Sequence, residues 1–157
     1  MEADVKAPGL EYVGTYEAML KPPLEIQGPF GMRQILEISG GEYRAASGGR
    51  GELLTGGGDW LLAGDDGYAR LDVRGQIRMD DDAILFVQYL GVLELNEAVQ
   101  DALANGTATN FEDQYFRTTP RFEVSDPRYA WLQQGAFIGQ GRVIEGLGVQ
   151  YNVFRVT

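Results

Sequence analysis

The chain alternates apolar and polar residues over many short segments, and turn-forming residues stand between these segments. Asp65-Asp66-Gly67 precedes the segment Tyr68–Met79, and Asp80-Asp81-Asp82 separates that segment from Ile84–Leu90. A side-chain period of two is typical of strands, and Asp-Gly turns join such strands into hairpins. About eight to ten antiparallel strands at this spacing predict an all-β chain that forms a closed barrel or a sandwich.

The other segments extend this pattern along the chain. We expect one short helix over Asn96–Asn105, because Asn96 can cap it, apolar residues recur at four-residue spacing, and Gly106 can end it. Gly40-Gly41 and Gly48-Gly49 read as turns on either side of another short strand. At 157 residues the chain fits a single domain, with residues 1–9 as a flexible amino-terminal segment. Further strands are expected over 10–20, 32–39, 50–55, 59–63, 115–124, 129–138 and 148–156.

The chain has neither cysteine nor histidine, which restricts the chemistry that it can perform. Disulfides, thiolate nucleophiles, the commonest general base and the commonest metal ligands are all excluded. We therefore expect no metal and no redox cofactor, since oxygen ligands alone make a weak and unselective site for zinc, copper or iron. Any catalysis must use Asp, Glu, Tyr, Lys or Arg side chains.

The formal net charge of −10 argues against two classes of partner. Nucleic acids and anionic membrane surfaces both need a basic face on the protein. The sequence also shows no charged-then-apolar leader and no apolar run of membrane-spanning length. We expect a cytoplasmic protein that binds neither nucleic acid nor membrane.

Four blocks of the sequence resemble a known family. The most distinctive is Tyr115–Glu123 with Asp126–Leu132, where two arginines, two threonines and a proline stand between aromatic residues. The others are Gly51–Arg74, Ile84–Gly91 and Phe137–Gly141. In this order they are similar to the DUF3237 (UPF0311) family, which is grouped by fold with allene oxide cyclase and dirigent proteins. The resemblance implies a closed barrel, but it does not imply a particular reaction. We expect the helix over Asn96–Asn105 to lie outside this barrel.

The resemblance also bears on assembly. The fold relatives form oligomers, and strands such as Ile84–Leu90 are apolar on both faces. We therefore expect a homo-oligomer.

Asp59 is the first candidate for acid/base chemistry. It follows three glycines and precedes Trp60, in a position that matches the family's Asp-Trp pair. A carboxyl group half-buried beside an indole would have a raised pKa and could exchange a proton near neutral pH. The alternative is a turn residue whose side chain bonds its own backbone. With histidine and cysteine absent, we expect Asp59 to be the principal acid/base, and Asp72 to be its substitute.

Charged residues share single faces of two expected strands. Arg70, Asp72 and Arg74 alternate with apolar residues, so they form a solvated face or point into the barrel mouth. Arg117 and Arg121 likewise share a face, where they could clamp a carboxylate or an enolate oxygen, or could belong to an internal Arg–Glu network. The functional alternative assigns Arg121 to catalysis and Arg74 and Arg117 to substrate binding.

Aromatic residues complete the candidate site. Tyr89 is either a core tyrosine or a donor to a substrate oxygen, and Trp60 and Trp131 could hold an aromatic or polyene body. Two functions remain open. One is a cofactor-independent lyase, isomerase or cyclase acting on a small aromatic or polyketide-like molecule inside the barrel. The other is a non-catalytic carrier or sensor that only binds a small apolar or aromatic ligand.

Overall fold

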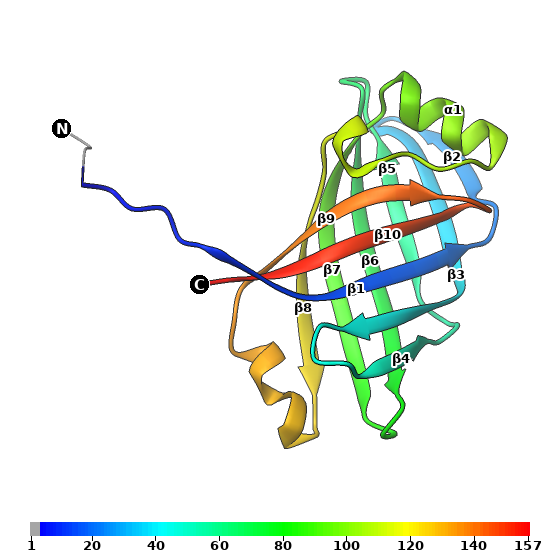
Figure 1. Ribbon diagram of the computed structural model, residues 1–157. Helices are drawn as coiled ribbons and strands as arrows, with labels where there is room; N and C mark the ends of the chain where they lie inside the picture. Colours follow the sequence, from blue (N-terminus) through cyan, green and yellow to red (C-terminus); the bar gives the residue numbers. More distant parts are fainter. Residues whose placement is uncertain (1–3) are drawn as a thin grey trace.

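The computed structural model describes residues 4–157, which form ten strands, one α-helix and two short 3₁₀ helices (Figure 1). No helix in this part of the chain is long and apolar enough to cross a membrane. The elements are β1 (Leu10–Leu20), β2 (Leu24–Gly28), β3 (Gly31–Ala45), β4 (Arg50–Leu53), β5 (Gly58–Ala63), β6 (Tyr68–Met79), β7 (Ile84–Glu94), α1 (Glu97–Asn105), η1 (Phe111–Asp113), β8 (Phe116–Val124), η2 (Pro127–Gln133), β9 (Phe137–Ile144) and β10 (Gly148–Val156).

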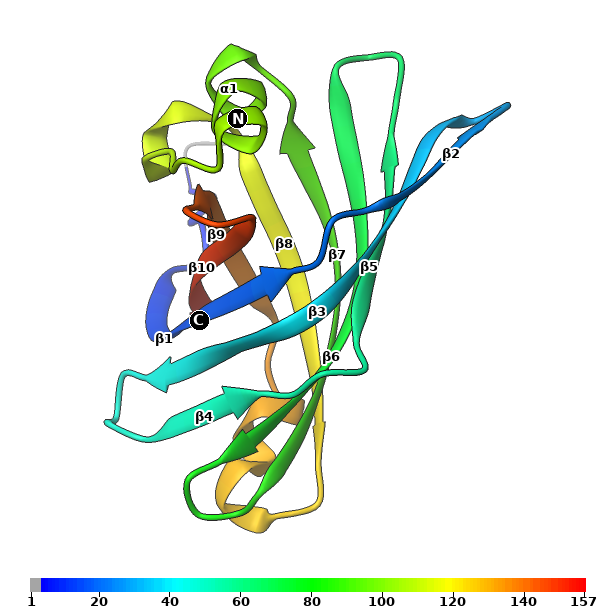
Figure 2. The same cartoon turned by 90° about the vertical axis from the view of Figure 1, so that its right-hand side faces the viewer.

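Eight strands close into an antiparallel barrel. They follow the order β1-β10-β9-β8-β7-β6-β4-β3, and β3 pairs back with β1 to complete the ring. A closed ring satisfies the backbone groups that an open sheet would expose at its edges. β5 pairs with β3 and β6 next to β4, and β2 pairs with β3 where that strand extends beyond the ring (Figure 2). The prediction of a closed antiparallel barrel with an external helix is confirmed.

Alternation along the strands places the core inside this ring. In β6 every second residue from Ala69 to Met79 is buried, while Arg70, Arg74 and Arg78 between them are exposed. Successive side chains of a strand point to opposite faces, so the buried series lines the interior.

Glycines leave room for large side chains in this interior. At Gly141 a Cβ atom would lie 2.7 Å from the Phe116 ring, and at Gly139 it would collide with the Thr118 hydroxyl. β9 can therefore pass close to the side chains of β8.

Two sequence-based expectations about the strands are wrong. Gly40-Gly41 is not a turn, because β3 continues through it from Gly31 to Ala45. A Cβ atom at Gly41 would collide with the Glu17 carbonyl group of β1, so this glycine permits a close approach of two strands. The expectation for this region therefore divided one long strand into two, and it also missed β2.

The predicted strand over 129–138 is a 3₁₀ helix followed by the start of β9. The Arg128 backbone N–H donates to the Asp126 side chain over 2.9 Å, and Pro127 occupies the start of η2. A side-chain cap and a proline at the first helical position favour helix initiation over a strand ladder. The expected helix is confirmed as α1, where Val99 N–H donates to Asn96 over 3.0 Å and Gly106 ends the helix in the left-handed conformation.

Candidate functional site

Asp59 lies on the inner face of β5. It stands opposite Leu36 of β3 and Val73 of β6, which are both buried, and only 5% of Asp59 itself is exposed. Its Oδ1 atom accepts a hydrogen bond of 3.1 Å from the backbone N–H of Asp72. The bond goes to a neighbouring strand, so Asp59 is not the locally bonded turn residue of the alternative hypothesis.

The preceding glycines explain how Asp59 reaches this position. At Gly57 a Cβ atom would collide with the Arg74 carbonyl group, and the Gly57 carbonyl accepts a 2.9 Å hydrogen bond from Ile38 N–H. Only a residue without a side chain fits between β3 and β6 at this point. The bend therefore brings β5 between the two strands and directs Asp59 inward.

Burial changes the acidity of Asp59. Loss of solvent raises the pKa of the Asp59 carboxyl group to about 7, while the hydrogen bond from Asp72 N–H acts in the opposite direction and the Asp72 charge raises the pKa further. A group with a pKa near neutrality can both accept and donate a proton at physiological pH. Asp59 thus has the property required of a general acid/base.

Three tyrosines from different strands meet in the barrel interior. Tyr16 of β1, Tyr89 of β7 and Tyr151 of β10 have ring centroids 5.3 to 6.2 Å apart, and Phe116 lies against Tyr151. The Tyr89 hydroxyl donates to the Tyr151 hydroxyl over 3.4 Å, whereas the buried Tyr16 hydroxyl has no hydrogen-bond partner among the described residues. The interior therefore contains hydroxyl groups that could bond to a guest molecule.

Asp59 and the tyrosines share one electrostatic environment. Val73 pairs with both Asp59 and Tyr89, so these two residues lie two strands apart on the same inner face, about 10 Å between backbones. Burial raises the pKa of Tyr89 and of Tyr151 well above the usual value, and the charge of Asp59 adds to the increase in both. The phenols consequently stay protonated and act as hydrogen-bond donors.

The space in the interior is small. A cavity of about 20 Å³ lies among the tyrosines, next to Thr118 and Pro120, and has room for a single water molecule. A larger pocket of about 380 Å³ opens at the barrel mouth beside η2 and is lined by Val13 and Trp131. Tyr43 connects the two spaces, since it lines the cavity while its hydroxyl donates over 3.3 Å to the carbonyl of Val13, which lines the mouth pocket. An aromatic guest can enter the interior only if side chains move.

The two tryptophans lie apart from Asp59. Trp60 is on the outer face of β5 and 42% exposed, because adjacent residues of a strand point in opposite directions. Trp131 lies on η2 at the mouth pocket, with its ring 6.1 Å from that of Phe137. Trp60 therefore cannot hold a guest against Asp59, and Trp131 can contact one only at the entrance.

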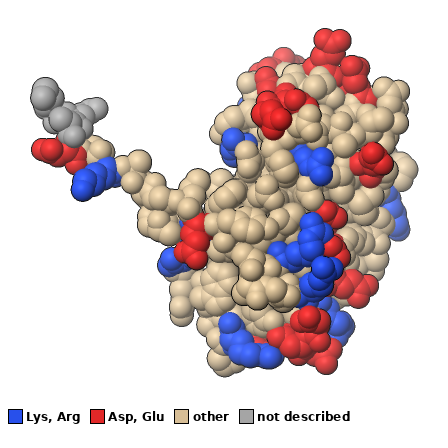
Figure 3. All heavy atoms as spheres, viewed as in Figure 1, with Lys and Arg blue, Asp and Glu red and all other residues tan. Residues whose placement is uncertain are grey.

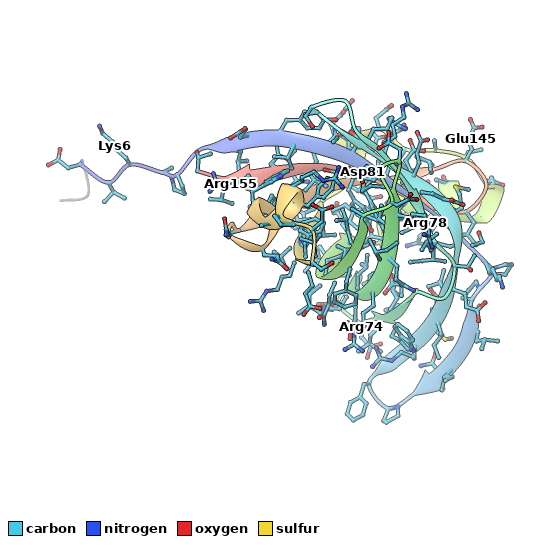
Figure 4. The ribbon with its side chains drawn as sticks, turned by 90° about the horizontal axis from the view of Figure 1, so that it is seen from below. Lys6, Arg74, Arg78, Asp81, Glu145 and Arg155 are labelled. Carbon is cyan, nitrogen blue, oxygen red and sulfur yellow. The ribbon has the colours of Figure 1, made fainter. Side chains whose placement is uncertain are left out.

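The arginines and Asp72 also face outward, which rules out the alternative that points them into the barrel. Tyr89 pairs with Pro120, so the next residue, Arg121, points away from the interior. Arg117 lies on the same outer face of β8. Arg74 lies on the outer face of β6, and Figure 4 shows its side chain. The structure thus separates Arg121 from Tyr89, and the solvated-face alternative holds for β6.

The short helix η2 lies at the lower end of the barrel (Figure 1). The hydroxyl group of Tyr129 in η2 donates a hydrogen bond to the carboxylate of Asp81 in the β6–β7 turn. Arg128 forms an ion pair of 3.2 Å with the same carboxylate. Figure 4 shows Asp81 beside this helix. These contacts hold η2, and with it Trp131, at the entrance to the barrel.

Sequence reasoning missed Tyr16, Tyr43 and Tyr151. Each alternates with small or aliphatic residues on one face of its strand, such as Gly14 and Ala18 around Tyr16. This alternation is a signal for an inward tyrosine, but it does not reveal that residues 135 positions apart, as Tyr16 and Tyr151 are, would meet.

Comparison with known proteins identifies the family. Residues 8–156 match the family described as "Protein of unknown function (DUF3237)". The chain belongs to this family. A UPF0311 protein of Clostridium acetobutylicum is 31% identical over 108 residues, which cover 69% of this chain and 68% of the relative. A UPF0311 protein of Rhodopseudomonas palustris is 32% identical over 109 residues, covering 69% and 71%.

Other relatives extend the comparison to fungi and to solved structures. "PR-toxin biosynthesis cluster protein 7" of Penicillium roqueforti is 31% identical over 64% of this chain and 56% of its own length. The crystal structure of a Rhodopseudomonas palustris protein of unknown function superimposes with a TM-score of 0.88 at 27% identity, covering 98% of this chain and 100% of that one. An enzyme from Penicillium herquei shares the fold, with a TM-score of 0.71 at 15% identity, covering 98% and 97%.

Proposed function

We propose that this protein is a cofactor-independent lyase, isomerase or cyclase that transfers protons on a small aromatic or polyketide-like molecule at Asp59. One observation carries the proposal, namely a buried carboxyl group whose pKa is raised to about 7 on the inner face of the barrel. Strongly perturbed carboxyl groups are concentrated at functional sites, where they serve as acids and bases.

The proton would move in two steps. Ionised Asp59 removes a proton from a carbon next to a substrate carbonyl, which leaves a neutral carboxylic acid and an enolate. The interior phenols of Tyr151 and Tyr16 donate hydrogen bonds to the enolate oxygen as its negative charge develops, while the Tyr89 hydroxyl donates to Tyr151. Asp59 then returns the proton to a different substrate atom, so the protein ends the cycle unchanged. The tyrosines thus take the part that the sequence suggested for Arg121.

Substrate entry requires a rearrangement at Tyr43. The mouth pocket of about 380 Å³ can accept an aromatic ring, whereas the interior cavity of about 20 Å³ cannot. In our proposal the guest first contacts Trp131 at the mouth, and the Tyr43 side chain releases the Val13 carbonyl to admit it. Closure behind the guest would exclude water from the proton transfer.

The relatives support the general class of function. One fungal relative is named for the biosynthesis cluster of PR-toxin, and a more distant protein with the same fold is described as an enzyme. Both descriptions are compatible with chemistry on a small molecule in this barrel. They give no substrate for this chain.

Hydrogen–deuterium exchange tests the proposed chemistry without knowledge of the natural substrate. We would incubate the protein with 2-tetralone, an aromatic ketone with exchangeable α-protons, in deuterated buffer and follow deuterium incorporation by NMR. The wild-type protein should accelerate exchange, and Asp59→Asn should reduce the acceleration by roughly 100-fold or more, as expected for loss of a general base. Asp72→Asn is the matched control, because its carboxyl group is on the outer face of the neighbouring strand.

Two outcomes would count against the proposal. Equal exchange with Asp59→Asn would exclude Asp59 as the base. Binding of 2-tetralone, measured by NMR titration, without accelerated exchange would favour the non-catalytic carrier.

A further inference from the structure

An apolar groove of about 630 Å³ lies on the outside of the barrel, over β6, β7, β8 and β9. The backbone at Leu71, Gly91 and Thr118, which pair with one another across three strands, forms its floor, because the side chains of Leu71 and Thr118 point into the barrel. Four large side chains at the groove are well exposed: Leu10 (57%), Leu90 (59%), Tyr115 (53%) and Val92 (37%). Exposed apolar side chains that are grouped in this way are typical of a surface that another molecule covers.

The groove also carries a positive charge that the chain itself does not neutralise. The Arg117 guanidinium lies over the Tyr115 ring, 5.2 Å from its centroid, and donates one hydrogen bond of 3.0 Å to the Phe116 carbonyl. Within residues 4–157, no carboxylate lies within ion-pairing distance of Arg117, whereas Arg70 at the groove edge is paired with Asp66 over 2.6 Å. The occupant should therefore combine apolar groups with at least one negative charge.

The amino-terminal segment of the chain has this composition. Asp4–Gly9 contains the apolar residues Val5, Ala7 and Pro8, the negative Asp4 at its outer end and the positive Lys6, and all six residues are exposed, Val5 to 78%. The segment joins the barrel at Leu10, which belongs to the groove wall, and extends away from the barrel surface (Figures 1 and 3). A 2.9 Å hydrogen bond from Thr157 N–H to the Gly9 carbonyl holds the base of the segment in this direction.

We propose that the groove is occupied by the amino-terminal segment of a second copy of this chain. Because each segment starts at the edge of its own groove, a two-fold axis near Leu10 would place the two grooves side by side and exchange the segments reciprocally. Val5 and Pro8 would cover Leu90 and Val92, and Asp4 would pair with Arg117.

The length of the segment is sufficient for this exchange. The six residue steps from Asp4 to Leu10 span about 20 Å when extended, whereas the groove crosses four strands, which is about 14 Å. This assembly deepens the expectation of a homo-oligomer and does not depend on the chemistry proposed for Asp59.

Disulfide trapping tests the exchange directly. The natural chain has no cysteine, so introduced thiols react only with each other. We would mix the single variants Val5→Cys and Leu90→Cys, oxidise them mildly, and identify the linked peptides by mass spectrometry. The expected product joins the two variants and has twice the 17.3 kDa mass of one chain. Ile84→Cys is the matched control for Leu90→Cys, because it is exposed on the same face of β7 but outside the groove.

Light scattering on the unmodified protein provides the second measurement. We expect a dimer at micromolar concentration, and Leu90→Asp should shift it to a monomer while Ile84→Asp should not. A monomeric wild-type protein would overturn the proposal. So would a trapping experiment in which Val5→Cys forms a disulfide with Ile84→Cys as readily as with Leu90→Cys. It would also be overturned if the double variant Val5→Cys/Leu90→Cys closed a disulfide within one chain at high dilution, since the segment would then occupy its own groove.

Discussion

Replacing Asp59 by Asn should change how the stability of the protein depends on pH. Burial raises the pKa of Asp59 in the folded state from 3.8 to about 7. The folded protein therefore holds this proton at pH values where the unfolded chain has released it. The contribution of Asp59 to the free energy of unfolding is greatest below the pKa of the unfolded chain. It falls as the pH rises towards the folded-state pKa near 7, and it levels off above that pH.

The size of this effect follows from the two pKa values. The full difference of about three units corresponds to about 4 kcal/mol, and the part lost between pH 5 and pH 8 is about 2 to 3 kcal/mol. The asparagine side chain of the Asp59→Asn variant cannot ionise, but its oxygen can still accept the hydrogen bond from Asp72 N–H.

Urea denaturation at several pH values between 5 and 8 measures this difference. The free energy of unfolding of the wild-type protein should fall with pH by about 2 to 3 kcal/mol more than that of Asp59→Asn. Asp72→Asn should keep most of the wild-type fall, because Asp59 remains buried in that variant. If the wild-type protein and Asp59→Asn differed by the same amount at every pH, Asp59 would not titrate near neutrality, and the reasoning for its role as an acid/base would fail.

Three further changes test other parts of the structure. Tyr16→Phe removes a buried hydroxyl that has no partner among the described residues, so the free energy of unfolding should stay the same or rise by up to about 1 kcal/mol. Tyr89→Phe removes the hydrogen bond to Tyr151 and should lower the free energy of unfolding by about 1 kcal/mol. A clear loss of stability with Tyr16→Phe would contradict this. Gly141→Ala should cost about 1 to 3 kcal/mol in urea denaturation, because the added methyl group meets the Phe116 ring, while Gly28→Ala, which projects into open space, should have a much smaller effect. Prolonged dialysis against EDTA should leave the melting temperature unchanged, and a decrease that added metal reverses would show that a metal contributes to the fold.

Local patterns were sufficient to predict most of the strands. Alternation and turn residues correctly bounded Leu10–Leu20, Tyr68–Met79 and Gly148–Val156, and the Asn96 cap with Gly106 bounded α1. These features depend on residues close together in the sequence. Where a glycine served a contact between distant strands, as at Gly41 beside Glu17, the same local reasoning mistook it for a turn.

Asp59 could be selected by elimination, because a chain without histidine or cysteine leaves few proton carriers. Its neighbours could not be selected in this way. Alternation divides a strand into two faces without showing which face lies inside, so the outward positions of Arg121 and Trp60 required the closed barrel.

The amino-acid sequence by itself therefore determined the strand pattern, the helix and the restricted set of chemical groups. Only the tertiary structure decided which groups are removed from water and which meet. The pKa of Asp59 near 7 arises from burial, and the contact of Tyr16 with Tyr89 and Tyr151 arises when β1 pairs with β10 to complete the ring. Both properties depend on closure of the barrel, which buries one face of every strand and brings together residues from opposite ends of the chain.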